Sequence, residues 1–498
     1  MNIKRAKEEI IHTIKAYFQK DSYGEYVIPV VHQRPVLLLG APGIGKTRIM
    51  EQIASECGIA LVSYTITHHT RQSAIGLPFI SHETFGGRET AVTEYTMSEI
   101  VASLYQKMKQ TGLSEGILFI DEINCVSETL APAMLQFLQC KSFGNHQIPQ
   151  GWIIVAAGNP PEYNKSVREF DVVTLDRVKK IDVEPDFDVW KEYARDAAVH
   201  PAVISYLNAR PLHFYKMETT IDGKLFATPR GWEDLSRILQ VYEDLSITMD
   251  SEVVVQYIQH PDIAKDFAAY LELYAKYQAD YELDQVFEGH IPDILIKKTA
   301  HASFDERLSL VSLLLARCET AFRKYCMEED YVTLLHGELK RLRDHLIPGA
   351  PFMPAFLESM NDLRQTREAR QRAELLGRNE KITRLRAEEF FDKALPVLQT
   401  YTGDDAFSLL RDRFGTEKAA YDESFEAAGC CLEYAFDFLE AAFGTGQELV
   451  WFITELNTSR ISLRFLEHYA CERYDRYNQS LLYENRSRAI LRRLEALD

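Results

Sequence analysis

A glycine-rich run near the N-terminal end carries the strongest chemical signal in the sequence. It reads Gly40-Ala41-Pro42-Gly43-Ile44-Gly45-Lys46-Thr47 and fits the pattern G-x-x-x-x-G-K-[ST] at every fixed position. The glycines allow backbone N–H groups to curl around an oxyanion, the lysine can pair with phosphates, and the threonine hydroxyl can ligate Mg²⁺. An apolar run at 36–39 precedes the motif and a helical stretch at 47–57 follows it, as a phosphate loop requires. The pattern predicts a nucleotide site, and a chance glycine-rich turn is the disfavoured alternative.

Two adjacent carboxylates, Asp121 and Glu122, follow the apolar run 117–120. Asp121 is suited to hold Mg²⁺ through water, and Glu122 to orient or deprotonate an attacking water molecule. Such a pair is a weak signal alone, because many strands end in Asp-Glu at a solvated edge. Together with the loop at 40–47 it predicts that the chain binds ATP with Mg²⁺ and hydrolyses it.

Three further side chains are candidates for contact with the reacting phosphate. Asn159, at the end of the β-rich run 152–157, could hydrogen-bond the attacking water or the γ-phosphate, although Gly-Asn-Pro alone reads as a turn. Arg177 and Arg230 could stabilise charge on a transferring phosphoryl group. For any single arginine a surface salt bridge is the more common role.

The elements around these residues predict an open α/β sheet. Five β-rich runs alternate with helical stretches, at 36–39, 60–66, 117–120, 152–157 and 178–183. Near-continuous apolar runs of this length are typical of strands that are buried on both faces of a parallel sheet. Residues 1–20 predict an amphipathic helix, and 76–95 an exposed hairpin that turns at Gly86-Gly87.

The sequence beyond residue 185 predicts mainly helices. Residues 187–208 and 232–242 read as helices, and nearly everything after about 290 is helical. The stretch 363–391 is rich in Arg and Glu, which indicates a solvated helix or helical hairpin. We expect three domains: an α/β core at 1–185, a helical lid at 186–285 and an all-α domain of unknown role at 286–498.

The composition of the chain limits the classes of protein and of function that it fits. The chain has 498 residues, of which 46% are hydrophobic, and a net charge of -18, so it is globular and poorly suited to broad contact with phosphate backbones. Its eight cysteines form no CxxC pair, which favours free thiols and a cytoplasmic location. The charged N-terminal end lacks a signal peptide's apolar region, and the apolar run 449–456 is too short to cross a membrane.

The motifs in this order resemble a MoxR-type AAA+ ATPase: GAPGIGKT, ILFIDE, AAGNP, TLDR and ATPRGW. The resemblance covers roughly residues 1–275, and the MoxR assignment rests on Gly76-Leu77-Pro78 and on the segment 200–211. Ala41 stands where proline is more usual in the family, and Val178 where a larger side chain is frequent.

The resemblance implies roles that spacing alone does not show. It implies an AAA+ sheet and a helical lid, with Asn159 as the first sensor, Arg230 as the second, and Arg177 as an arginine finger that acts on a neighbouring subunit's ATP. A finger acting in trans requires a ring, in this family typically a hexamer. The insert at 76–95 would then touch a partner or the pore.

Three functions remain open from the sequence. The first is a chaperone-like ATPase that remodels or assembles a protein client, in the manner of MoxR-type proteins that work with a von Willebrand factor A domain partner. The second is a nucleic-acid motor or restriction-type translocase, against which the negative charge counts. The third is a nucleotide switch with little turnover, which would not need Glu122 as a base.

Overall fold

The structure, a computed structural model, describes residues 1–68, 71–143, 146–163, 170–221, 223–281, 283–346, 351–399 and 403–481. Its chain divides into two compact units. The first contains residues 1–189, 228–230 and 366–376, and the second contains 190–227, 231–365 and the chain from 377 onward. Most of the predicted lid and most of the C-terminal region thus lie in one unit, while a three-part division at 185 and 285 stays a prediction.

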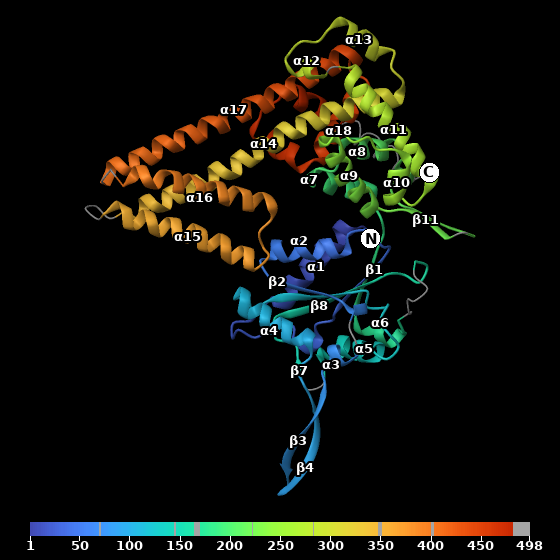
Figure 1. The fold of residues 1–498 in the computed structure, drawn as a ribbon, viewed down its shortest axis with the longest axis vertical. Helices are drawn as coiled ribbons and strands as arrows, with labels where there is room; N and C mark the ends of the chain where they lie inside the picture. Colours follow the sequence, from blue (N-terminus) through green and yellow to red (C-terminus); the bar gives the residue numbers. More distant parts are fainter. Residues whose placement is uncertain are drawn as a thin grey trace, which may run out of the picture. The chain divides into compact units, whose positions relative to one another are not determined.

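A five-stranded parallel sheet forms the centre of the first unit (Figure 1). In spatial order the strands are β2 (Ala60–Thr65), β5 (Gly116–Asp121), β8 (Trp152–Gly158), β1 (Val36–Gly40) and β9 (Lys179–Val183). All five predicted β-rich runs are therefore confirmed as strands. Every residue of β8 is buried, which is why its sequence is apolar throughout and does not alternate between apolar and polar residues.

Helices link and cover these strands. They are α1 (Ile3–Phe18), α2 (Lys46–Cys57), α3 (Arg71–Ile75), α4 (Glu99–Thr111), α5 (Ala131–Cys140) and α6 (Val172–Arg177), with short 3₁₀ turns η1 (Val30–His32) and η2 (Ile66–His68). The predicted N-terminal amphipathic helix is confirmed as α1, which buries Ala6, Ile10 and Ile14. This parallel sheet with flanking helices is the α/β core that the sequence predicts.

Two small hairpins accompany the sheet. The predicted exposed hairpin is confirmed as β3 (Pro78–Phe85) paired with β4 (Arg88–Tyr95), and Figure 1 shows it projecting from the core. Gly86 and Gly87 have φ angles of 57° and 81°, which the tight two-residue turn requires. A shorter pair joins β6 (Ser142–Phe143) to β7 (His146–Gln147).

The lid region contains five α-helices and one hairpin in its described residues. They are α7 (Phe187–Asp196), α8 (Pro201–Ala209), the turn η3 (Pro211–His213), β10 (Lys216–Thr220), β11 (Gly223–Ala227), α9 (Pro229–Asp244), α10 (Ser251–Tyr257) and α11 (Pro261–Asp280). The prediction of one helix over 187–208 is wrong. Ala198 adopts a left-handed φ of 55° and Pro201 starts α8, because proline lacks the N–H that a helix interior needs. The hairpin β10–β11 was not predicted.

The rest of the second unit is helical in its described residues. It comprises α12 (Leu283–Phe287), α13 (Asp293–Ala300), α14 (Phe304–His345), α15 (Phe352–Arg372), α16 (Arg378–Leu398), α17 (Gly403–Phe443), α18 (Gln447–Thr458) and α19 (Arg460–His468). The 42-residue helix α14 runs beside α17, and Figure 1 shows the pair side by side. One apolar core surrounds the first half of α14, and another joins its second half to α15, α16 and the start of α17.

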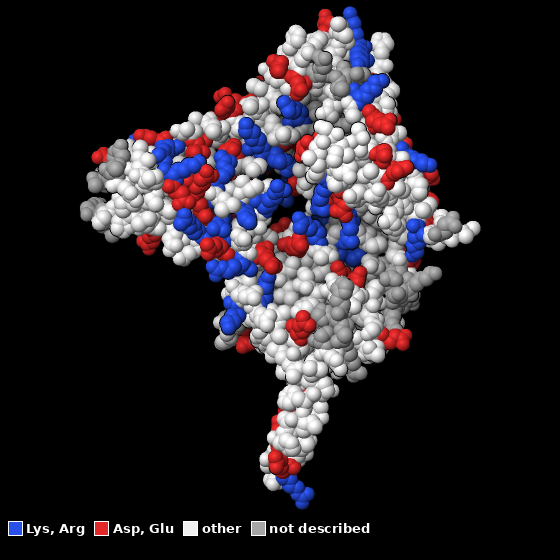
Figure 2. All heavy atoms as spheres, in the orientation of Figure 1, with Lys and Arg blue, Asp and Glu red and all other residues white. Residues whose placement is uncertain are grey.

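The Arg- and Glu-rich stretch 363–391 is confirmed as a helical hairpin, α15–α16. Its inner face is buried at Leu363, Ala387 and Phe391, and most of its charged residues are exposed or half-buried, while Glu388 is buried. Figure 2 shows basic and acidic side chains interspersed over these helices on the face in view. Within the described part of the chain, none of the helices is both long and apolar enough to cross a membrane.

Candidate nucleotide site

The predicted phosphate loop lies at one edge of the sheet. It connects the end of β1 to the start of α2, while β5 ends at Asp121 and β8 ends at Gly158. Because these strands are parallel and adjacent, their carboxyl ends bring the loop, the carboxylates and Asn159 to the same edge. The three motifs, of which the first and the last are more than a hundred residues apart in the sequence, therefore meet in one place.

Glycine is required at specific positions of this loop. Gly43 and Gly45 have φ angles of 78° and 95°, a region that side chains with a Cβ rarely adopt. A Cβ added to Gly40 would lie 2.5 Å from the Val183 carbonyl oxygen of β9. The loop thus has the wide backbone turn that lets successive N–H groups face an anion at a helix N-terminus.

The Lys46 side chain lies inside this loop. Its Nζ donates hydrogen bonds to the carbonyl oxygens of Gly40 at 2.7 Å and Ala41 at 2.8 Å, and to Asn159 Oδ1 at 2.9 Å. Only 8% of Lys46 is exposed. An ammonium held at the centre of the loop by neutral oxygens can exchange some of these partners for phosphate oxygens.

Burial, with a smaller contribution from the positive charge of Arg230, lowers the pKa of Lys46 to about 8, while Asp121 opposes the shift. Bound phosphates would stabilise the ammonium and raise this pKa again. Nucleotide binding is therefore coupled to protonation of Lys46. Below the lowered pKa the free site already holds the proton, and above it binding must take one up.

ATP affinity is expected to be constant below about pH 8, the pKa of Lys46, and to weaken above it. The loss should approach tenfold per pH unit, since one proton is taken up on binding. Titration with a fluorescent ATP analogue on both sides of pH 8 measures this profile. Lys46→Arg is the control, because a guanidinium stays charged across the range. A flat profile for the unmodified chain would show that Lys46 is charged well above pH 8.

Thr47 and Asp121 form the second contact of the site. The Thr47 hydroxyl donates to Asp121 Oδ2 at 2.9 Å, so both oxygens face the same point beside Lys46. A hydroxyl and a carboxylate are the hard oxygen donors that Mg²⁺ prefers, and Mg²⁺ usually retains several waters beside one or two protein ligands. These residues fit the metal that an ATP site uses.

Glu122 is held in an uncommon backbone conformation. Its φ is 56°, and its N–H donates to Asp121 Oδ1 at 2.9 Å. Its carboxylate accepts a hydrogen bond from the Thr67 hydroxyl at 3.0 Å. A strained, hydrogen-bonded carboxylate next to Asp121 is well placed to act on water. Thr67, which follows β2, was missed by sequence reasoning because no motif marks it.

Asn159 is supported by a second residue that the sequence did not indicate. Asn124 is 4% exposed, and its Nδ2 donates to the Asn159 carbonyl oxygen at 2.8 Å. A Cβ added to Gly158 would lie 2.6 Å from Asn124 Oδ1, so glycine is needed there for this close approach. The Asn124 amide fixes the end of β8 and with it the side chain that contacts Lys46.

The two candidate arginines lie in different surroundings. Arg230, at the start of α9, lies against the loop: its Cβ would be 3.4 Å from a Cβ added at Gly43, and its charge acts on Lys46. Arg177, at the end of α6, is exposed and donates to the Gln139 side chain. The structure therefore brings Arg230 to the loop, and it leaves Arg177 on an exposed surface of the first unit.

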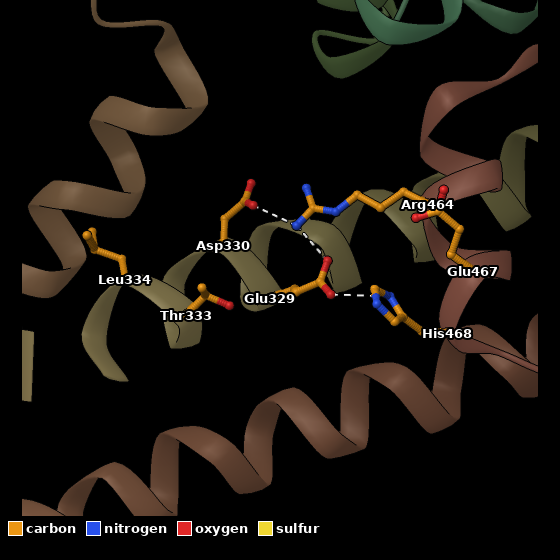
Figure 3. A pocket seen from close by; sticks show the side chains of 7 residues that line it. All are labelled: Glu329, Asp330, Thr333, Leu334, Arg464, Glu467 and His468. Atoms are coloured by element: carbon orange, nitrogen blue, oxygen red, sulfur yellow. Dashed lines mark hydrogen bonds and ion pairs between the residues drawn. The ribbon is translucent and has the colours of Figure 1, made fainter. Parts of the chain in front are cut away.

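The second unit contains a separate shallow depression of about 560 Å³ (Figure 3). Arg464 pairs there with Glu329 at 2.5 Å and with Asp330 at 2.6 Å, and His468 pairs with Glu329 at 3.3 Å. Figure 3 shows these side chains pointing toward one another. They form a surface ion-pair network, and none of the residues predicted to act on nucleotide lines it.

Comparison with known families gives one match. Residues 36–174 match the model of the ATPase family associated with various cellular activities (AAA). The matched region contains the phosphate loop, both carboxylates and Asn159. None of the curated proteins matches the chain.

Several solved structures share partial similarity. A RuvB variant from Thermotoga maritima is 15% identical over 45% of this chain and 62% of its own, with a TM-score of 0.27. The T. maritima RuvB Holliday junction branch migration motor is 17% identical over 52% and 69%, with a TM-score of 0.26. C. elegans PCH-2 is 14% identical over 44% and 50%, with a TM-score of 0.24. The chain thus spans less than two thirds of the first of these proteins.

Proposed function

We propose that this chain binds ATP with Mg²⁺ and hydrolyses it to drive movement of its lid, and the match of residues 36–174 to the AAA family model supports this. One observation carries the proposal: hydrogen bonds of 2.9 Å join Lys46 to Asn159 and Thr47 to Asp121, and the Glu122 N–H donates to Asp121. Each of these side chains has a part in nucleotide hydrolysis, and they lie at or beyond the carboxyl ends of the strands β1, β5 and β8.

These residues have different roles in ATP hydrolysis. The loop N–H groups and Lys46 bind the β- and γ-phosphates, while Thr47 and Asp121 would hold Mg²⁺, which neutralises the charge that develops on those phosphates. Glu122 accepts a proton from the attacking water, and Asn159 orients that water or the γ-phosphate. Arg230 reaches the γ-phosphate from the lid, so hydrolysis would change the lid's contacts.

We further propose that the chain acts as a MoxR-type remodelling ATPase in a homo-oligomeric ring, typically a hexamer. The exposure of Arg177 supports this, because an arginine finger must be accessible to a neighbouring subunit's ATP. The projecting hairpin β3–β4 and the C-terminal helices would engage a protein client or a von Willebrand factor A domain partner. Interspersed charge on the face of the C-terminal helices that Figure 2 shows counts against a nucleic-acid track there.

Mixing two inactive variants tests the ring. Glu122→Gln and Arg177→Ala are each expected to lose at least about 100-fold in ATP turnover. In a random one-to-one mixture, about a quarter of the interfaces pair an intact Glu122 with an intact neighbouring Arg177. Turnover should therefore recover to about a quarter of the wild-type rate, measured by phosphate release, with assembly mass measured in parallel.

Two results would contradict this proposal. A wild-type chain that stays monomeric with ATP, together with full activity of Arg177→Ala, would remove the trans arginine and favour the nucleotide switch. Affinity for DNA that falls steeply with salt would instead favour the nucleic-acid motor.

A further inference from the structure

A buried cluster of charged side chains joins the lid helix α7 to the C-terminal helices. Lys191 Nζ pairs with Glu455 Oε1 of α18 at 2.9 Å, and Arg195 pairs with both Glu455 and Glu319 of α14. Arg195 is only 4% exposed and Glu455 only 1%. Four ionised groups from three helices are thus held together inside the second unit.

Further hydrogen bonds surround this ionic cluster, which we define as Lys191, Arg195, Glu319 and Glu455. The Arg323 guanidinium of α14 donates to the carbonyl oxygens of Arg195 at 2.8 Å and Asp196 at 3.1 Å, which caps the C-terminal end of α7. Trp451 Nε1 of α18 donates to Glu455 Oε1 at 3.1 Å. The end of the lid helix is therefore fixed by both its side chains and its backbone.

Buried charges are a poor way to gain stability, because desolvation offsets most of their attraction. Removing one partner is costly, however, since it leaves an unpaired charge in an apolar place. The charged side chains of such a cluster stay paired in only a few arrangements of the helices, whereas apolar side chains can shift against one another without losing a specific partner. It therefore restrains α7 to one orientation against α14 and α18.

A second set of contacts connects α7 and α8 to α9. Tyr193 donates to Glu233 at 2.9 Å, the His200 N–H donates to Ser236 Oγ at 2.7 Å, and Gln240 donates to the Ala198 carbonyl oxygen at 2.7 Å. Helix α9 begins at Pro229, and its second residue is Arg230, beside the phosphate loop. The orientation of α9 therefore depends on helices that the ionic cluster holds.

We propose that the ionic cluster makes the C-terminal helices a positioning element for Arg230, so that lid and C-terminal region rotate as one body when ATP binds. The inference rests on the proposed ATPase function. The continuous helix α14 extends this body toward the hairpin α15–α16, where Arg386 binds Glu328 through two hydrogen bonds of 2.9 Å. Lys191, Arg195 and Glu455 are thus positioning residues, and the C-terminal region senses the nucleotide through them.

Lys191→Met tests the positioning role with limited risk to folding, because Glu455 keeps Arg195 and Trp451 as partners. We expect kcat for ATP to fall about 10-fold, since Arg230 is misplaced, while the Kd for ATP stays within about twofold. Lys265→Met is the matched control, an exposed lysine of α11 outside the cluster, and should leave both constants unchanged. An unchanged kcat in the folded Lys191→Met variant would overturn the proposal.

Distances between fluorophores test the single body directly. Labels attached through unnatural amino acids at the exposed positions Tyr105, Leu245 and Leu385 report on the core, the lid and the C-terminal hairpin. They are placed in a Glu122→Gln background, which should hold ATP without turnover. On ATP addition the transfer efficiency between Tyr105 and Leu245 should change, and that between Leu245 and Leu385 should stay constant. In Lys191→Met the second efficiency should change as well.

The two proposals fail in different ways. Absence of ATP binding, measured with a fluorescent analogue, would reject the proposed function itself. Bound ATP with a changing distance between Leu245 and Leu385 in the unmodified cluster would overturn the single body alone. Bound ATP with no change in either distance would also overturn it, because the lid would then have no movement to transmit.

Discussion

Replacing Lys46 with alanine is expected to weaken ATP binding by about 30- to 4,000-fold, which corresponds to roughly 2–5 kcal/mol for removal of one partner of a buried charge pair. The side chain is 8% exposed and donates to two loop carbonyls and to Asn159. Alanine removes the only charge that the loop itself places at its centre, while the glycine conformations remain. Calorimetric titration with ATP and Mg²⁺ measures the loss.

Lys109→Ala provides the matched control for Lys46→Ala, because Lys109 is an exposed lysine of α4 in the same unit. Its ATP affinity should equal that of the wild type. Thermal unfolding of both variants without nucleotide separates lost binding from lost folding, and Lys46→Ala should unfold cooperatively since it also removes a buried charge. Unchanged ATP affinity in a folded Lys46→Ala variant would rule out the phosphate-loop assignment.

The sheet and the phosphate loop could be predicted because their signals are local. The strand at 152–158 is apolar throughout, since both faces are covered, and the loop's glycines are fixed by left-handed φ angles at Gly43 and Gly45. The hairpin turn at Gly86-Gly87 is specified in the same way. Where the backbone conformation at a position requires a particular residue type, a single sequence is enough to predict the local structure.

The helix boundaries in the lid were harder to predict from the sequence. The run 187–208 has apolar residues at helical spacing, but Ala198 turns left-handed and Pro201 begins a new helix. The hairpin β10–β11 consists of short strands with several exposed residues, Lys216 to Thr220 and Gly223 to Ala227. Neither alternation nor an apolar run distinguishes such strands from a loop.

The supporting residues of the site could not be predicted, because their partners are distant in sequence. Thr67 meets Glu122 across 55 residues, and Asn124 meets Asn159 across 35. Arg195 and Glu455 are 260 residues apart, and each alone reads as a surface charge of a helix. Residue type does not reveal which of many charges are buried together, and tertiary structure is needed to find them.

The geometry around Glu122 separates its chemical role from its structural one. Its N–H is bound by Asp121 and its carboxylate accepts from Thr67, so a glutamine at this position could keep both hydrogen bonds through its N–H and its amide oxygen. Glutamine and glutamate also differ little in size. Substitution by glutamine therefore removes the proton-accepting carboxylate with little disturbance of the metal ligands or the loop.

Glu122→Gln is accordingly expected to bind ATP within about twofold of the wild type and to hydrolyse it about 10²- to 10⁴-fold more slowly, the usual contribution of a positioned general base. Single-turnover phosphate release measures the chemical step, and equilibrium titration measures binding.

Thr67→Val is the companion variant: it keeps the base but removes the hydroxyl that orients it, so a smaller loss of about tenfold is expected. If Glu122→Gln retained wild-type turnover, another group would have to activate the water. If Thr67→Val matched Glu122→Gln, orientation of the carboxylate would matter as much as its basicity.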